Sequence, residues 1–152
     1  MIHCSYLRHL RGQRYLISVN KGRHKVAEAQ RHKVKTFRDL IVWQKAMQLV
    51  TQIYLITKGL PKEEIYGLTP QIRRSSVSIP SNIAEGYGRN FTNDYIRFLQ
   101  IATASLYELQ TQLEICLNLE YLSKQIFKEL YEKSREIERM ISSLIRKLTP
   151  DK

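Results

Sequence analysis

The chain has 152 residues, a net charge of +11 and a hydrophobic content of 43%, which suit one globular domain. Four prolines and six glycines exclude a low-complexity protein, and two cysteines in different contexts exclude a disulfide framework. No apolar run approaches the ~20 residues of a membrane-spanning helix and no secretory h-region is recognisable, so we expect a soluble, cytoplasmic protein without membrane contact.

The positive charge is concentrated in residues 1–36. This segment has one acidic residue, Glu28, and an excess of eight positive charges, whereas residues 37–152 have an excess of three. The segment is open to three interpretations: a basic arm that contacts phosphates, an Arg-rich targeting peptide, or a misassigned start whose true first residue is Val34. We predict a basic, poorly ordered extension over 1–36 and one domain over 37–149. The basic residues of the extension are Arg8, Arg11, Arg14, Lys21, Arg23, Lys25, Arg31, Lys33 and Lys35.

Residues 39–58 have the apolar spacing of a first helix, which Gly59 and Pro61 end. Two apolar stripes run side by side along it and make an arc wider than one seam of a bundle needs. Because large exposed apolar surfaces mark interfaces, we predict that this helix contacts other copies of the chain. The residues predicted for this oligomer interface are Val42, Trp43, Leu49, Ile53 and Ile56.

Residues 67–89 predict a second helix with two parallel stripes. Thr69 suits the N-cap and Pro70 the first helical position, whereas Pro80 lacks an N–H inside the helix and predicts a kink. The apolar stripe, which should face the core, is Ile72, Ser76, Ile79, Ile83 and Tyr87. The polar stripe beside it is Gln71, Ser75, Ser78, Asn82, Glu85 and Arg89.

Two further helices complete the pattern. The third is predicted to run to about Leu119 with Cys116 on its buried face. The fourth is predicted from Ser123, as its N-cap, to Leu148, with heptad-like apolar spacing. Four helices joined by short connections predict an all-α fold, an antiparallel up-down four-helix bundle.

Three stretches of the sequence resemble a known family. They are Gln71-Ile72-Arg73-Arg74, Ser78-Ile79-Pro80-Ser81-Asn82-Ile83-Ala84-Glu85-Gly86 with Gly88-Arg89, and Phe37-Arg38-Asp39-Leu40. Together they look like the signature of the 23S rRNA intervening-sequence proteins, a bacterial family also called four helix bundle proteins. The resemblance covers residues 37–148. It implies a four-helix bundle, a ring-like homopentamer, and an RNA or ribonucleoprotein partner.

The polar residues of the second helix have two interpretations. In the first they form a structural network, in which Glu85 pairs with an arginine and Asn82 satisfies backbone groups near Pro80. This network is predicted to contain Gln71, Ser78, Asn82, Glu85 and, from the third helix, Glu108. In the second, guanidinium groups bind phosphate, and the candidate nucleic-acid contacts are Arg73, Arg74 and Arg89.

Nothing in the sequence indicates an enzyme, a metal site or a cofactor. A di-metal centre in a four-helix bundle needs Glu-x-x-His pairs; none occurs, and no histidine follows His32. Glu85 and Glu108 are a conceivable acid and base, but they lack a nucleophile, a histidine and a phosphate-binding glycine loop. We therefore expect no catalytic residue, no metal, no cofactor and no small-molecule substrate.

Two functions remain. The first is a non-enzymatic, homo-oligomeric protein, a pentamer by the family resemblance, that binds structured RNA or a ribonucleoprotein. The alternative is a protein–protein scaffold, or an accessory factor of a mobile element similar to the accessory proteins of diversity-generating retroelements, without specificity for nucleic acid. Salt dependence separates the two, because binding to phosphates weakens steeply as salt is added.

Overall fold

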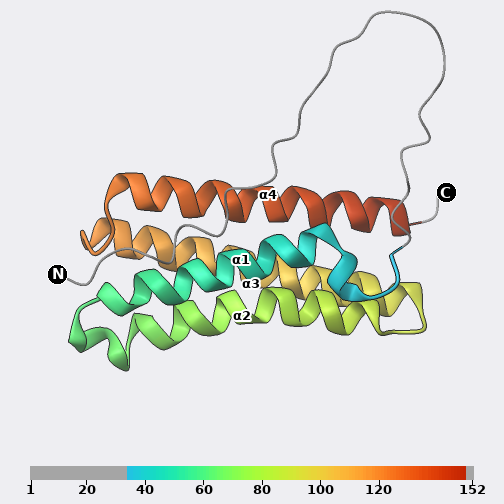
Figure 1. The fold of residues 1–152 in the computed structure, drawn as a ribbon, viewed down its shortest axis with the longest axis horizontal. Helices are drawn as coiled ribbons and strands as arrows, with labels where there is room; N and C mark the ends of the chain where they lie inside the picture. Colours follow the sequence, from blue (N-terminus) through green and yellow to red (C-terminus); the bar gives the residue numbers. More distant parts are fainter. Residues whose placement is uncertain (1–33, 150–152) are drawn as a thin grey trace, which may run out of the picture. The chain divides into compact units, whose positions relative to one another are not determined.

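A computed structural model describes residues 34–149 of the chain, and four long helices make up most of this part (Figure 1). The predicted all-α bundle is therefore confirmed for these residues. Most of the predicted extension, and the three interpretations of it, lie outside the described residues. The helices are α1 (Ile41–Ile56), α2 (Leu68–Tyr87), α3 (Thr92–Asn118) and α4 (Lys124–Leu148). Short 3₁₀ turns flank α1: η2 (Phe37–Asp39), η3 (Thr57–Gly59) and η4 (Lys62–Ile65).

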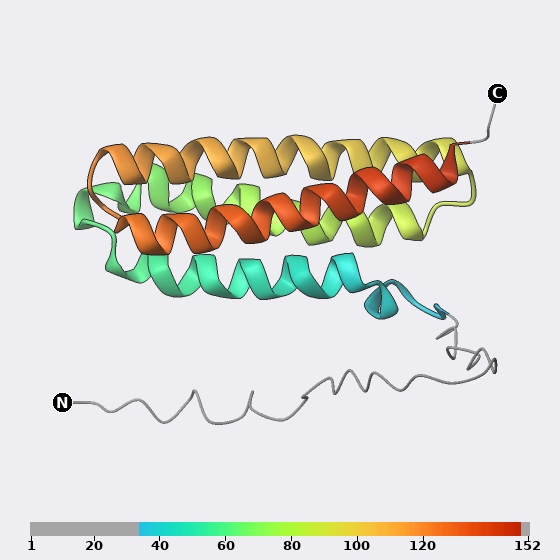
Figure 2. The ribbon, with the colours of Figure 1, turned by 90° about the horizontal axis from the view of Figure 1, so that it is seen from above.

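The four helices lie along one another, with their connections at the two ends of the bundle (Figure 2). Each helix packs against two others: α2 against α1 and α3, and α4 against α1 and α3. Ser123 caps α4 as predicted, its hydroxyl accepting a hydrogen bond from the Ile126 N–H at 3.3 Å. Within residues 34–149, none of the helices is both long and apolar enough to cross a membrane.

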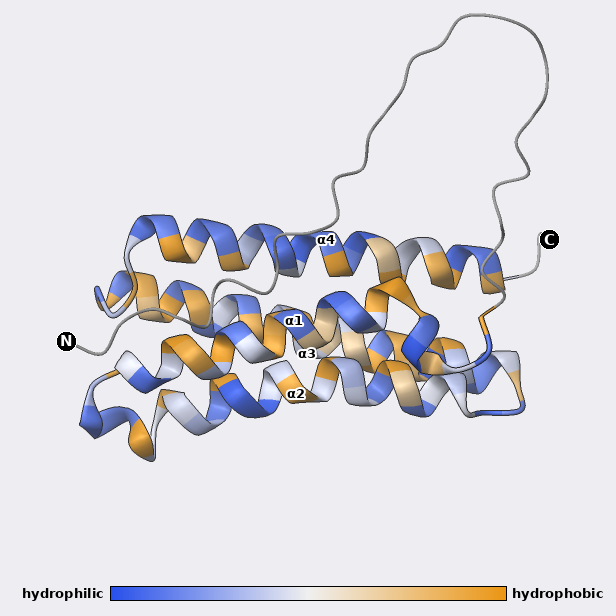
Figure 3. Ribbon diagram, in the orientation of Figure 1, coloured by the Kyte–Doolittle hydropathy of each residue, from blue (hydrophilic) through white to orange (hydrophobic). Residues whose placement is uncertain are grey.

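The core is built from the apolar stripe of every helix. On α4, the hydrophilic residues lie on the outward side of the helix, and the apolar residues lie on the side toward the other helices (Figure 3). The apolar stripe predicted for α2 is buried except at its end, where Tyr87 is half-buried, and Cys116 of α3 is buried as predicted. The largest fully buried side chains are Leu49, Ile53, Ile72, Ile79, Ile83, Leu99, Leu106, Leu109, Leu113, Cys116, Ile137 and Ile141.

The oligomer interface predicted on α1 is wrong for three of its five residues. Val42 is 5% exposed and Leu49 and Ile53 are at most 1% exposed, because α2 and α4 together cover this face of α1. Trp43 and Ile56 are half-buried and pack against the same core. The wide apolar arc of α1 is thus used mainly inside the subunit, since the helix has two neighbours to contact.

Pro80 does not interrupt α2, which is one continuous helix on both sides of it. Two side chains bond the carbonyls of the turn in which the proline N–H is missing. The Ser81 hydroxyl donates to the Val77 carbonyl and the Asn82 amide donates to the Ser78 carbonyl, each at 2.8 Å. These side chains add donors to the two carbonyls that follow that of Ser76, the carbonyl to which Pro80 cannot donate.

α2 and α3 approach each other closely at Gly86. A Cβ atom placed there would lie 2.7 Å from Cδ2 of Tyr95 and 2.8 Å from Cβ of Phe98. Neither atom is the end of a flexible side chain, so the two helices would have to separate to make room.

We predict that Gly86→Ala lowers the free energy of unfolding by about 1–2 kcal/mol, because overpacking outweighs the helix propensity gained. Urea denaturation measures the change. Gly59→Ala is the matched control, since a Cβ there meets nothing within 4 Å, and its unfolding midpoint should not fall. Equal midpoints for the two variants would contradict this account of the α2–α3 contact.

Candidate nucleic-acid interface

An open groove of about 630 Å³ lies where α1 ends and α2 begins. The last turns of α1, the connection through η3 and η4, and the first three turns of α2 supply its walls. Most of the lining is apolar or hydroxyl-bearing: Tyr54, Thr57, Leu60, Pro61, Ile65, Thr69, Pro70 and Val77. The other lining residues are all cationic: Lys58, Lys62, Arg73 and Arg74.

Among the described residues, 34–149, no carboxylate lines this basic groove. The ion pairs between described residues lie elsewhere, and none of them includes a cation of the groove. Four positive side chains around one concavity create a positive potential, which attracts an anionic ligand. The groove is therefore the part of the described chain that is best suited to bind phosphate.

Arg73 is held in place on the wall of the groove. Its Nε donates to the Thr57 hydroxyl at 2.8 Å, and that hydroxyl donates to the Tyr54 carbonyl at 3.3 Å. The guanidinium carbon also lies 4.9 Å from the centre of the Tyr54 ring. These contacts use Nε and leave both terminal nitrogens without a hydrogen-bond partner among residues 34–149. A guanidinium oriented in this way can donate two hydrogen bonds to one phosphate.

The structure brings together only two of the three predicted arginines. Arg74 is exposed beside Arg73 on the groove, whereas Arg89 follows the far end of α2, which is about 20 Å from Arg74 by helical rise. Arg89 pairs with Glu85 and stacks over the Phe98 ring at 4.7 Å. Its contacts assign it to the α2–α3 end of the bundle and not to the groove.

Lys58 and Lys62 belong to the groove and were absent from the sequence-based candidates. They flank the short connection between α1 and α2, Lys58 in η3 and Lys62 in η4. A short connection brings the last turn of one helix beside the first turn of the next. This spacing is a signal in the sequence that would have linked the two lysines with Arg73 and Arg74.

The other polar residues of α2 form a ladder with α3. The Ser75 hydroxyl donates to Oε1 of Gln112 at 2.7 Å, and the hydroxyls of Ser78 and Ser105 are 2.8 Å apart. The ladder continues from Gln112, whose amide donates to Glu108 at 3.1 Å. It satisfies polar groups at a helix seam and fixes the register of the two helices.

This ladder differs from the interior network predicted from the sequence. Ser78, Asn82 and Glu108 take part in it or border it, but Glu108 is exposed. Gln71 and Glu85 are also exposed. Glu85 pairs with an arginine as predicted, and this partner is Arg89, which follows the end of α2. The prediction did not include Ser105 and Gln112, because one sequence does not tell which residues of two helices face each other.

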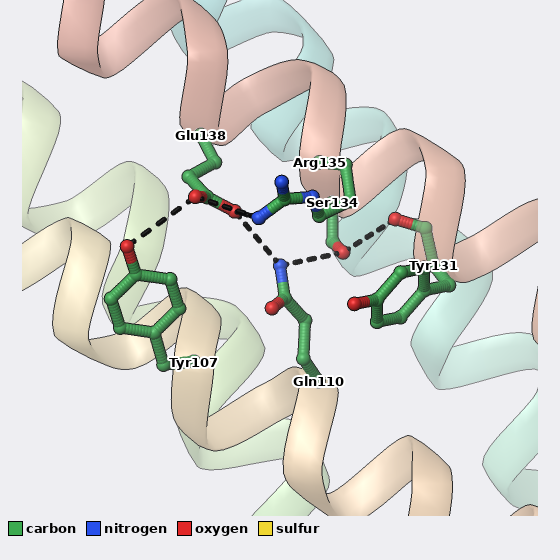
Figure 4. Close-up of polar contacts among 6 residues, drawn as sticks. All are labelled: Tyr107, Gln110, Tyr131, Ser134, Arg135 and Glu138. Atoms are coloured by element: carbon green, nitrogen blue, oxygen red, sulfur yellow. Dashed lines mark hydrogen bonds and ion pairs between the residues drawn. The ribbon is translucent and has the colours of Figure 1, made fainter.

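A second polar network joins α3 to α4 and was not predicted (Figure 4). The buried Gln110 amide donates to the Ser134 hydroxyl at 3.1 Å and to Glu138 at 3.3 Å. Glu138 also accepts from Tyr107 at 3.3 Å and from Nη1 of Arg135 at 2.7 and 2.8 Å. The buried donors of this cluster, the Gln110 amide and the Ser134 hydroxyl, each have an acceptor, so we interpret the network as structural. Across residues 34–149, no three His, Cys, Asp or Glu side chains gather as metal ligands would.

Glu64 ties the start of α2 to the connection between α3 and α4. Its carboxylate accepts from the Leu68 N–H at 2.8 Å and from the Tyr121 hydroxyl at 3.2 Å. Burial and the Glu64 carboxylate raise the pKa of Tyr121. The helix thus begins at Leu68 with an acceptor from Glu64, and the predicted cap at Thr69 is wrong.

Residues 38–143 match the family described as 23S rRNA-intervening sequence protein. The chain belongs to this family. All four cations of the groove lie within the matched residues. The resemblance inferred from the sequence motifs is therefore confirmed.

A solved structure supports the same fold. It is a protein with unknown function from the S23 ribosomal protein family of Bacteroides thetaiotaomicron, 27% identical in sequence, with a TM-score of 0.65. The similarity covers 69% of this chain and 98% of that one. No curated protein matches the chain.

We predict that Cys116 is inert to iodoacetamide at pH 8 in the folded protein. Burial, with a smaller effect of the Glu64 carboxylate, raises the pKa of this thiol to about 11, so the reactive thiolate is scarce. Mass spectrometry of the Cys116 peptide measures the rate of alkylation. The same protein in urea should react far faster, and equal rates in the two states would contradict the burial.

Proposed function

We propose that this protein is a non-enzymatic, RNA-binding member of its family, which binds structured RNA or a ribonucleoprotein in the cytoplasm through the basic groove. The observation that carries the proposal is the set of four cations around one concavity with no carboxylate and no ion pair among residues 34–149. The family name, which refers to intervening sequences of 23S rRNA, supports RNA as the partner.

We further propose that the working form is a homo-oligomer, with the pentamer implied by the family resemblance as its size. Ile41 and Leu55 of α1 are 61% and 60% exposed and lie on one face of the helix, which supports a contact between copies there. An up-down antiparallel bundle is the proposed subunit. Its support is that residue numbers run in opposite directions along the α2–α3 ladder, from Ser75–Gln112 to Ser78–Ser105.

We predict that Arg74→Gln weakens binding of a structured RNA hairpin several-fold and lowers the slope of log K against log salt by about 0.7–0.9. The reason is the loss of one phosphate contact. Fluorescence anisotropy at several salt concentrations measures both quantities. The matched control is Arg97→Gln, which removes one exposed charge on α3 outside the groove and should leave the slope unchanged.

A shortened form that begins at Val34 tests whether the groove or the basic N-terminal segment binds the RNA. Retained binding by this form, with the same loss from Arg74→Gln, supports the groove. Binding by the full-length protein alone, or equal slopes for Arg74→Gln and Arg97→Gln, would contradict the proposal.

A protein–protein scaffold, or an accessory factor of a mobile element, is the second candidate function. The exposed aromatic side chains favour it: Tyr66 in the α1–α2 connection is 95% exposed and Phe91 in the α2–α3 connection is 72% exposed. Such side chains are common at protein interfaces. A salt-independent association with a protein and no RNA binding would favour this candidate.

We predict that Leu55→Glu lowers the mass of the assembly measured by light scattering, because a charge on the exposed face of α1 opposes contact between copies. The subunit should stay folded, since Leu55 lies outside the core. Gln100→Glu adds the same charge at an exposed position of α3, away from this face of α1, and is the control for charge alone. An unchanged mass for Leu55→Glu would exclude this face as the interface.

A further inference from the structure

The basic groove is hollow, and its shape restricts what can enter it. Its volume of about 630 Å³ falls within the range of pockets that enclose small ligands. An RNA duplex keeps its bases stacked inside and presents phosphates on a convex surface, so a duplex can touch the rim of such a pocket but cannot fill it. The occupant has to be a small group that projects from its surroundings or is free.

The walls of the groove offer apolar surface as well as positive charge. Ile65, Val77 and two prolines supply apolar surface, and the Tyr54 side chain is 41% exposed although Arg73 lies over its ring. A ligand that carried only phosphate would leave this surface in water and gain nothing from it. A ligand with a flat apolar part and an anionic part would contact both kinds of wall.

The Tyr54–Arg73 pair is a preformed stacking surface. Unpaired bases are commonly bound on aromatic rings and on guanidinium planes, and here the two groups lie 4.9 Å apart with Arg73 held by Thr57. Lys58 and Arg74 border the same hollow and can neutralise the phosphates on either side of such a base.

We infer that the basic groove binds one unpaired nucleotide, its base against Tyr54 and the apolar wall and its phosphate on the cations. The inference rests on the proposed function and names the part of the RNA that the groove recognises. A free nucleoside monophosphate has the same chemistry as an unpaired nucleotide in RNA, so the test includes both.

The test uses the full-length protein and two RNA hairpins of equal length, one fully paired and one with a single unpaired nucleotide in its stem. We expect the bulged hairpin to bind at least about fivefold more tightly, as stacking of one base provides. Tyr54→Leu should remove this preference, so that the two hairpins bind this variant with equal affinity. Tyr54→Phe keeps the ring and should keep the preference. Adenosine monophosphate should compete with the bulged hairpin.

Circular dichroism verifies the fold of each variant. If Tyr54→Leu does not fold, Ile65→Glu replaces it, because it adds a carboxylate at an exposed position in the lining and should lower binding of the bulged hairpin the more strongly. Equal affinity for the two hairpins overturns the inference and leaves the proposed function intact. Binding of neither hairpin overturns both. If the monophosphate binds more tightly than the bulged hairpin, the nucleotide that the groove recognises is a free one and not part of an RNA.

Discussion

The close packing of α2 against α3 is the constraint on which the rest of the subunit depends. Small residues make it possible: Gly86 has no room for a Cβ, and the hydroxyls of Ser75 and Ser78 bond across the seam. Apolar burial alone is non-directional, whereas paired hydroxyls specify which turn of one helix faces which turn of the other. With this register set, a different side of α2 faces the end of α1, and that side carries Arg73.

The same packing explains why α2 has two different polar surfaces. Toward α3, the polar residues are short and neutral and they satisfy each other, as buried groups must. Toward α1, Arg73 donates a hydrogen bond to Thr57, which follows the end of α1. Arg74 is exposed to solvent. The contact with α3 stabilises the bundle, whereas the side toward α1 keeps the positive charges of Arg73 and Arg74 on the groove.

The groove needs the bundle, because none of its walls forms a site by itself. Glu64 bonds the start of α2 and the Tyr121 hydroxyl of the α3–α4 connection, so the helix that carries Arg73 is attached to the other pair of helices. Arg73, held by the Thr57 hydroxyl, would lose little conformational freedom on binding phosphate as proposed. That preorganisation distinguishes the groove from the scattered surface lysines and arginines of α4.

The sequence by itself determined the four helices, the buried stripe of α2 and the family, because helical period, capping residues and motifs are local properties of the chain. It also drew attention to Arg73 and Arg74. Only the tertiary structure decided which side chains meet: that Val42, Leu49 and Ile53 are core, that Arg89 lies apart, and that Lys58 and Lys62 complete the groove. The reason is physical. The width of an apolar arc does not reveal whether its partner is a neighbouring helix or another copy, and the rotation of each helix is set by packing between residues far apart in the chain.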